Sequence, residues 1–170
     1  MPEPSFVALT DTLLGLPQPR QRSLAVALAG LALPFAELSN GDHGKALGTL
    51  ITVLRRGGVL IEVEQARHQL FESEQLREAE EPVGLAWYSH RARVAWIYAA
   101  DAATTAPRDG VLNTFLVLDD MLDQADADLG RVALGLLLRE ELADGDPQLD
   151  ALQAAIPTVV ERLKVKLAST

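Results

Sequence analysis

One stretch, residues 111–128 (VLNTFLVLDDMLDQADAD), constrains the fold of this chain most strongly, because it is apolar at its start and acidic at its end. Wound as an α-helix, the stretch aligns two leucines with three aspartates and places a fourth aspartate beside that line. These residues are Leu112, Leu116, Asp119, Asp123 and Asp126, with Asp120 adjacent. The spacing therefore predicts a helix whose apolar face enters a core and whose far end presents carboxylates.

The rest of the chain repeats this helical spacing between proline and glycine residues that end helices. The pattern predicts helices over residues 5–16, 20–33, 43–56, 59–80, 85–104, 111–128, 130–143 and 148–166. Residues 106–110 are expected to form a loop, and Pro34 and Pro157 are expected to kink or interrupt two helices. Residues 59–63 alternate enough for a short strand, but no partner strand is evident, so a helix is preferred. We therefore predict a single all-α domain over residues 1–170 with seven or eight helices.

Composition indicates a soluble chain with a substantial core. Of the 170 residues, 48% are hydrophobic and 23% are charged, which excludes a disordered chain. No apolar run approaches the ~18 residues that a membrane span needs, and the first residues lack the basic segment of a signal peptide. The chain has no cysteine, so disulfides and thiolate metal sites are excluded. We expect a cytoplasmic protein that does not bind membranes.

The net charge of the chain is concentrated in one region. Residues 109–150 hold eleven aspartates and glutamates but only two arginines, and this excess of nine negative charges equals the net charge of the whole chain, −9. Such asymmetry argues against nucleic acid or an anionic membrane as the ligand. It favours a protein partner with a basic face.

The motif Asp119-Asp120-x-x-Asp123 matches the DDxxD pattern with which helical isoprenoid synthases hold Mg²⁺ and a diphosphate. Carboxylates four residues apart on a helix can coordinate a hard cation together. However, the chain is much shorter than that fold, and it shows neither a second metal motif nor a basic cluster for the diphosphate. The motif therefore favours an acidic helix end that faces solvent or a partner.

The three histidines, His43, His68 and His90, are widely separated in the sequence. Glu64, His68 and Glu72 can share one helix face, where local ion pairing is the simplest interpretation. No spacing of ligands from a second helix accompanies them. We expect no metal ion and no cofactor.

Asp101 lies among alanines in YAADAATTA (residues 98–106), on a helix expected to cross the core. A carboxylate buried there needs a cationic partner, and arginines from neighbouring helices are candidates. We expect Asp101 to be buried, and we assign Asp101 and Arg91 to structural ion pairing rather than to catalysis.

Two short motifs, Arg22-Ser23-Leu24-Ala25 and Leu33-Pro34-Phe35-Ala36-Glu37, resemble motifs of a helical immunity-protein family that protects bacteria against polymorphic toxins. The resemblance continues loosely through residues 47–54 and 94–103 and covers about half of the chain. It does not extend to the acidic segment 119–128. The resemblance implies an activity of binding and blocking a toxin, without catalysis.

The interpretation we prefer is a non-catalytic protein-binding module, an immunity or inhibitor protein that docks a basic partner. Its predicted contact residues are the four carboxylates of the acidic helix, Asp119, Asp120, Asp123 and Asp126. One alternative is a Mg²⁺-dependent enzyme that handles diphosphates through the DDxxD motif. The other is a scaffold or regulatory subunit that forms a homo-oligomer through its apolar helices.

Overall fold

The computed structural model describes residues 5–38, 43–130, 132–144 and 147–168, which form eight α-helices and no strand. The helices are α1 (Phe6–Leu14), α2 (Gln18–Ala36), α3 (His43–Arg55), α4 (Leu60–Glu78), α5 (Leu85–Ala103), α6 (Pro107–Leu129), α7 (Leu134–Ala143) and α8 (Asp150–Ala168). This confirms the predicted all-α class and helix number. None of the described helices combines the length and the apolar character that crossing a membrane requires.

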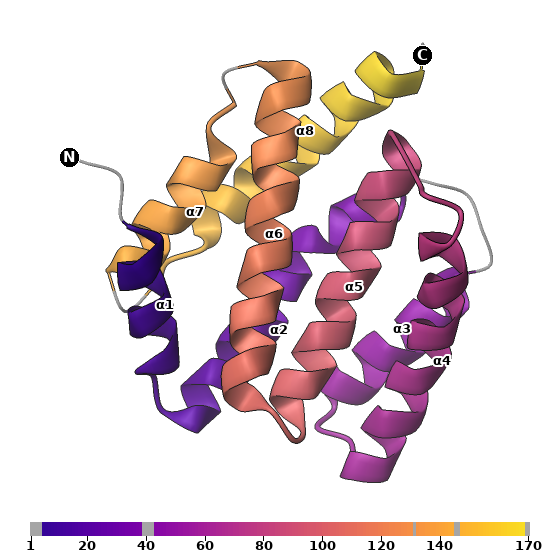
Figure 1. Cartoon of the computed structure of the whole chain (residues 1–170), viewed down its shortest axis with the longest axis vertical. Helices are drawn as coiled ribbons and strands as arrows, with labels where there is room; N and C mark the ends of the chain where they lie inside the picture. Colours follow the sequence, from indigo (N-terminus) through magenta and orange to yellow (C-terminus); the bar gives the residue numbers. More distant parts are fainter. Residues whose placement is uncertain (1–4, 39–42, 131, 145–146, 169–170) are drawn as a thin grey trace.

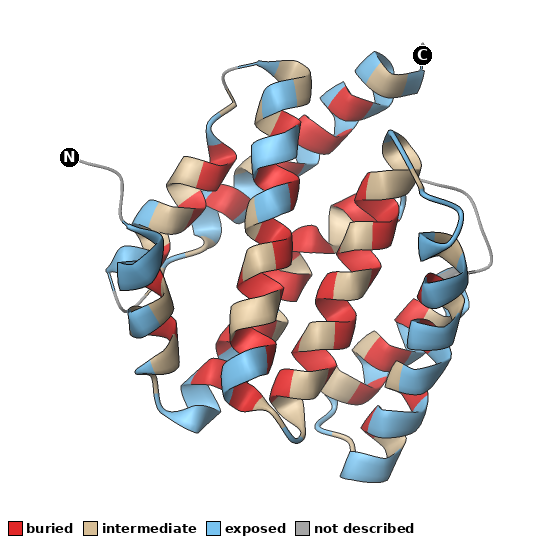
Figure 2. Cartoon of the chain, in the orientation of Figure 1, coloured by how far each residue is buried: buried red, intermediate tan, exposed pale blue. Residues whose placement is uncertain are grey.

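The core lies where α2, α5 and α6 meet. Figure 1 shows α5 and α6 side by side and antiparallel, with α2 behind them. Helices α1 and α7 cover one side of this centre, and α3 and α4 cover the other. Buried residues concentrate on the three central helices (Figure 2). Helix α5 packs against α6 on one flank and against α4 on the other.

Small side chains let α5 approach its neighbours closely. Ala92, Ala95, Ala99 and Ala102 are fully buried on this helix. Where α6 approaches α5, a Cβ added to Gly110 would lie 2.5 Å from the Cα of Ala102. A larger side chain at this point would therefore push α5 and α6 apart.

One expectation about helix boundaries is wrong, and the two prolines expected to kink or interrupt helices do not interrupt them. Helix α6 begins at Pro107 and not after residue 110, because proline suits the first turn of a helix, where its missing N–H costs no hydrogen bond. Helix α2 continues through Pro34 to Ala36; since the proline lies near the helix end, little helix remains for it to disrupt. Pro157 likewise lies inside the continuous helix α8.

Helix α6 also turns a different face to the core than the sequence predicts. Its buried core face recurs at three- and four-residue intervals and comprises Val111, Phe115, Leu118, Leu122 and Ala125. Leu112, Leu116 and Asp119 lie beside this face and are half-buried. The line of leucines and aspartates therefore runs along the edge of the core.

Candidate functional site

One arginine ties the acidic half of α6 to α7. Arg139 Nη1 donates to Asp119 Oδ1 at 2.6 Å and to Asp123 Oδ1 at 3.2 Å. The side chains of Arg139 and Asp119 are only 14% and 16% exposed. Burial raises the pKa of Asp119, and the nearby guanidinium opposes that rise. Asp119 therefore joins two helices and does not present its carboxylate to solvent.

Asp126 also has a structural role. Its Oδ1 accepts hydrogen bonds from the backbone N–H groups of Val132, at 2.5 Å, and Ala133, at 2.9 Å. Ala133 precedes α7 and has a left-handed backbone, with φ 57°. The Asp126 carboxylate thus braces the turn from α6 into α7.

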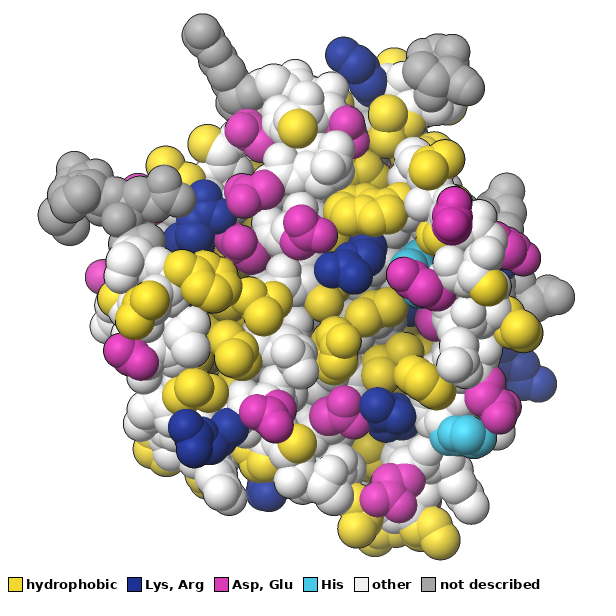
Figure 3. Space-filling model, in the orientation of Figure 1, with side chains coloured by type: hydrophobic (Ala, Val, Ile, Leu, Met, Phe, Trp, Pro, Cys, Tyr) yellow, Lys and Arg dark blue, Asp and Glu magenta, His cyan; other side chains and the backbone are white. Residues whose placement is uncertain are grey.

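Asp120 and Asp123 are the outward-facing members of the predicted acidic surface. Their side chains are 61% and 55% exposed. Figure 3 shows Asp and Glu side chains gathered over the upper part of the molecule, where α6 ends. The fold keeps the four predicted aspartates on one helix. Asp119 and Asp126 serve internal contacts, whereas Asp120 and Asp123 are mostly exposed, although Asp123 also accepts from Arg139.

The DDxxD motif is occupied by an arginine. Because Arg139 donates to both Asp119 and Asp123, a guanidinium lies where a shared cation would bind these two carboxylates. Among the described residues, no three His, Asp or Glu side chains are grouped so as to hold a metal ion.

Asp101 and Arg91 both form ion pairs, but not with each other. Asp101 Oδ1 accepts from Arg67 Nε of α4 at 2.5 Å, and its Oδ2 accepts from Arg67 Nη2 at 3.2 Å. Arg91 reaches Asp120 of α6 through a longer contact of 3.5 Å. Asp101 and Arg91 lie ten residues apart on one helix, about 15 Å along its axis, which separates them too far to pair. Asp101 is also less buried than expected, with 26% of its side chain exposed.

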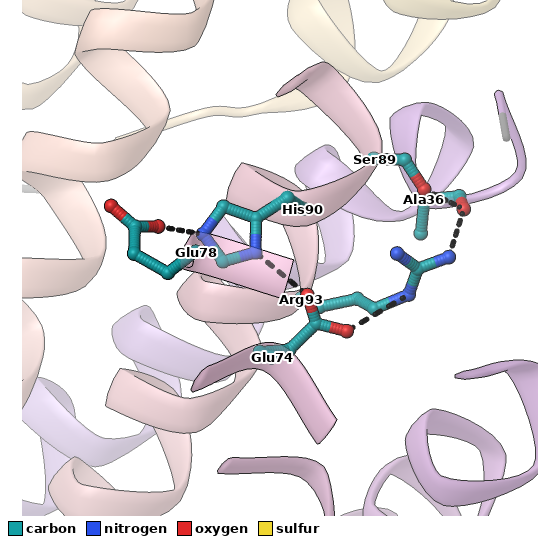
Figure 4. A network of polar contacts seen from close by, with 6 residues as sticks. All are labelled: Ala36, Glu74, Glu78, Ser89, His90 and Arg93. Atoms are coloured by element: carbon teal, nitrogen blue, oxygen red, sulfur yellow. Dashed lines mark hydrogen bonds and ion pairs between the residues drawn. The ribbon is translucent and has the colours of Figure 1, made fainter. Parts of the chain in front are cut away.

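A second site, which the sequence did not predict, is a buried ionic network between α4 and α5 (Figure 4). His90 of α5 faces Glu74 Oε2 through Nδ1 at 2.7 Å and contacts Glu78 through Nε2. Glu74 and His90 are 2% and 3% exposed, whereas the Glu78 side chain is 70% exposed. A neutral imidazole carries one N–H, so His90 donates to both carboxylates only when the ring holds two protons.

The inner end of the network reaches the end of α2. Arg93 Nε lies 3.6 Å from Glu74 Oε1, and its Nη2 donates to the carbonyl of Ala36 at 3.1 Å. The Ser89 hydroxyl donates to the same carbonyl at 2.6 Å. Burial lowers the pKa of Arg93, and the Glu74 carboxylate opposes this shift. The network therefore satisfies a carbonyl at a helix C-terminus, where such groups lack intrahelical partners.

Two neighbouring hollows lie along the α4–α5 interface and share Glu78, His90 and Arg91. The first has a volume of about 270 Å³, and its further lining is Arg67, Phe71, Glu74, Gln75, Val94, Ile97 and Tyr98. The second, of about 290 Å³, extends past the end of α4 to Trp87. We call the two together the α4–α5 groove.

One sequence signal could have found Glu74. On α4 the buried positions Val63, Ala66 and Leu70 recur at helical spacing, and Glu74 is the next position of this stripe. A glutamate that continues an apolar stripe is expected to be buried and paired. Its partners, His90 and Arg93, come from another helix, and no local pattern identifies them.

Comparison of the chain with protein-family models, curated proteins and solved structures finds no match.

Proposed function

We propose that this protein is a non-catalytic protein-binding module that docks a partner with a basic face through the surface around Asp120 and Asp123. The observation that carries the proposal is that both carboxylates are more than half exposed in the region that holds the whole net charge of the chain. Opposite charges on two proteins accelerate encounter and select orientation. Asp119 and Asp126 support this surface through their bonds to α7 and the preceding turn.

The finer proposal is that the partner is a toxin and that this protein neutralises it. It rests on the resemblance of the motifs at residues 22–25 and 33–37 to the immunity-protein family. Leu24, Ala25 and Phe35 of these motifs are buried in α2. These three residues therefore belong to the core of the protein, and we assign the contacts with the partner to the acidic surface.

The test compares two double variants of equal charge. Asp120→Asn with Asp123→Asn removes the proposed contacts, whereas Asp109→Asn with Asp150→Asn changes two other exposed aspartates. Asp109 lies eleven residues before Asp120 on α6, about 17 Å along the helix. A basic partner is captured from extracts of the source cells, and its association rate with each variant is measured at several salt concentrations.

We expect the first double variant to slow association at low salt and the control to change it little. The difference should shrink as salt screens charges over about 10 Å at 0.1 M. Equal losses in both variants would mean that net charge alone matters, which contradicts a defined docking surface.

A third double variant tests the diphosphate-enzyme alternative. If Asp119 and Asp123 bind Mg²⁺ and pyrophosphate, these ligands should raise the Tm, because binding to the folded state stabilises it. Asp119→Asn with Asp123→Asn should then abolish the rise. We expect no rise, because Arg139 already pairs with both carboxylates.

Self-association is a second candidate, favoured by three consecutive exposed apolar side chains at the start of α4. Val59, Leu60 and Ile61 are 62%, 51% and 62% exposed, and such apolar clusters often mark interaction surfaces. Light scattering of the wild type and of the Leu60→Glu variant tests this. A wild-type dimer together with a monomeric variant would favour the homo-oligomer.

A further inference from the structure

We infer that the α4–α5 groove is a binding site for a small organic carboxylate with a compact apolar body, and that Glu78 occupies the position of the ligand carboxylate in the free protein. The groove adjoins the acidic docking face, since Arg91 also contacts Asp120, but the inference does not depend on the proposed protein-binding function.

The first observation is the position of Glu78. Its carboxylate contacts Nε2 of His90, yet 70% of the Glu78 side chain is exposed, while His90 is 3% exposed. Glu78 is the last residue of α4, where a negative charge opposes the helix dipole. An exposed surface carboxylate therefore covers the outer nitrogen of a buried histidine, and another carboxylate can replace it.

The second observation is the arginine beside this contact. Arg91 lines both hollows of the groove together with His90 and Glu78. Its guanidinium carbon lies 5.9 Å from the centre of the Trp87 ring, and its contact with the exposed Asp120 is long, at 3.5 Å. Among the residues that the structure describes, none accepts a hydrogen bond from the buried Nε of Arg91. Arg91 thus retains donors for a second carboxylate, as arginine commonly provides.

The charges around the groove favour an anion once Glu78 moves into solvent. Glu74 is paired with His90 and Arg93, and Arg67 is paired with Asp101. The groups left facing the first hollow are then Arg91 and the Nε2 of His90, because Glu81 lines only the second hollow. Exchange of the Glu78 carboxylate for a ligand carboxylate leaves the local charge unchanged, so it avoids burying an unpaired ion.

Aromatic and aliphatic side chains provide the rest of the site. Phe71 of α4 and Val94, Ile97 and Tyr98 of α5 line the first hollow. Its volume of about 270 Å³ lies at the small end of ligand pockets. A ligand of this kind would place its carboxylate on His90 and Arg91 and its apolar body on these side chains.

The test uses phenylacetate as the probe, with calorimetric titration and chemical shifts of the His90 ring as readouts. Phenylacetamide and phenethylamine keep the apolar body but replace the carboxylate by a neutral group or a cation, and acetate keeps the carboxylate alone. N-acetylphenylalanine carries the free carboxylate of a peptide C-terminus, and its comparison with phenylacetate distinguishes a peptide end from a free organic acid.

We expect saturable binding of phenylacetate, with much weaker binding of the amide, the amine and acetate. Arg91→Gln should weaken binding about tenfold or more, as expected for loss of a charged hydrogen bond, whereas Arg108→Gln, an exposed residue that lines neither hollow, should not. Glu78→Ala should tighten binding, because it removes the competing carboxylate. If that variant does not fold, Glu78→Gln serves the same purpose.

Two results would overturn the inference. One is the absence of saturable binding by both carboxylate probes to the wild type and to the Glu78 variant. The other is binding that Arg91→Gln leaves unchanged or that the neutral amide matches, since neither result needs a carboxylate site.

Discussion

The two flanks of α5 are packed in opposite ways. Toward α6 the contact is apolar and close, with Gly110 against Ala102 and fully buried side chains such as Phe115. Toward α4 it is ionic, with Arg67 bound to Asp101 and His90 between two glutamates. The same helix therefore serves as a rigid core element on one side and as a polar interface on the other.

The two kinds of packing on α5 indicate where the fold can vary. Apolar packing depends on shape and responds little to pH or salt, whereas a buried ion pair is stable only while both partners are present and charged. The α4 flank also carries the groove and its replaceable Glu78 contact. We therefore expect functional adaptation on the α4 flank and sensitivity to side-chain volume on the α6 flank.

The largest effect is expected from breaking the ionic flank at its most buried member. Glu74→Ala removes the partner of both His90 and Arg93, and loss of one member of a buried pair costs ~3–5 kcal/mol. Denaturation by urea, followed by circular dichroism, measures the change. Glu78→Ala is the matched control, because its exposed side chain should cost less than ~1 kcal/mol. Similar losses in the two variants would contradict the central role of Glu74.

The next largest change in stability is expected from adding side-chain volume to the apolar contact between α5 and α6. Gly110→Ala adds one methyl group against the Ala102 backbone, and such overpacking costs ~1–3 kcal/mol or more. Gly48→Ala makes the same change on α3, where an added Cβ meets nothing within 4 Å. That control should gain ~0.5–1 kcal/mol from helix propensity. A stabilised Gly110→Ala would show that the α5–α6 contact is loosely packed.

A smaller effect is expected at the outer edge of the ionic flank. Asp101→Asn weakens the pair with Arg67, but both side chains are about a quarter exposed, so solvent screens the interaction. We expect a loss of ~1 kcal/mol that decreases at high salt, in urea titrations at two salt concentrations. A loss above ~3 kcal/mol would mean that the pair behaves as a fully buried one.

The smallest effect is expected at alkaline pH, from a titratable contact between α5 and α6 that involves Tyr88. The Tyr88 hydroxyl donates to Asp128 Oδ2 at 2.6 Å, and burial together with this carboxylate raises the pKa of Tyr88 above its usual 10.0. As the pH rises, the unfolded chain therefore loses the hydroxyl proton of Tyr88 at a lower pH than the folded chain does. The contribution to stability is complete below about pH 10 and is lost as the pH rises further.

Thermal melts between neutral pH and pH 11 measure this contribution. Tyr88→Phe should flatten the alkaline fall in Tm, and Tyr98→Phe, which changes the other tyrosine, should leave it as in the wild type. An identical alkaline fall in wild type and Tyr88→Phe would exclude the proposed linkage.

The sequence by itself determined the helices and the position of the acidic charge. Apolar spacing and the residues that begin and end helices are local properties, so they predicted seven or eight helices and placed four aspartates together on the helix that is α6. Even Glu74 was detectable in principle, as a glutamate within an apolar stripe. The net charge of residues 109–150 follows directly from their composition, so it was known without the structure.

Which charges are neutralised and which remain exposed depends on the tertiary structure. A helix turns about 100° per residue, so a shift of one position moved Leu112, Leu116 and Asp119 from the expected core face of α6 to its edge. Ion pairing depends on which helices become neighbours: Arg67 and Asp101 are 34 residues apart, and Asp119 and Arg139 are 20 apart. Such contacts form when packed helices bring distant residues together, and no local pattern in the sequence carries that information.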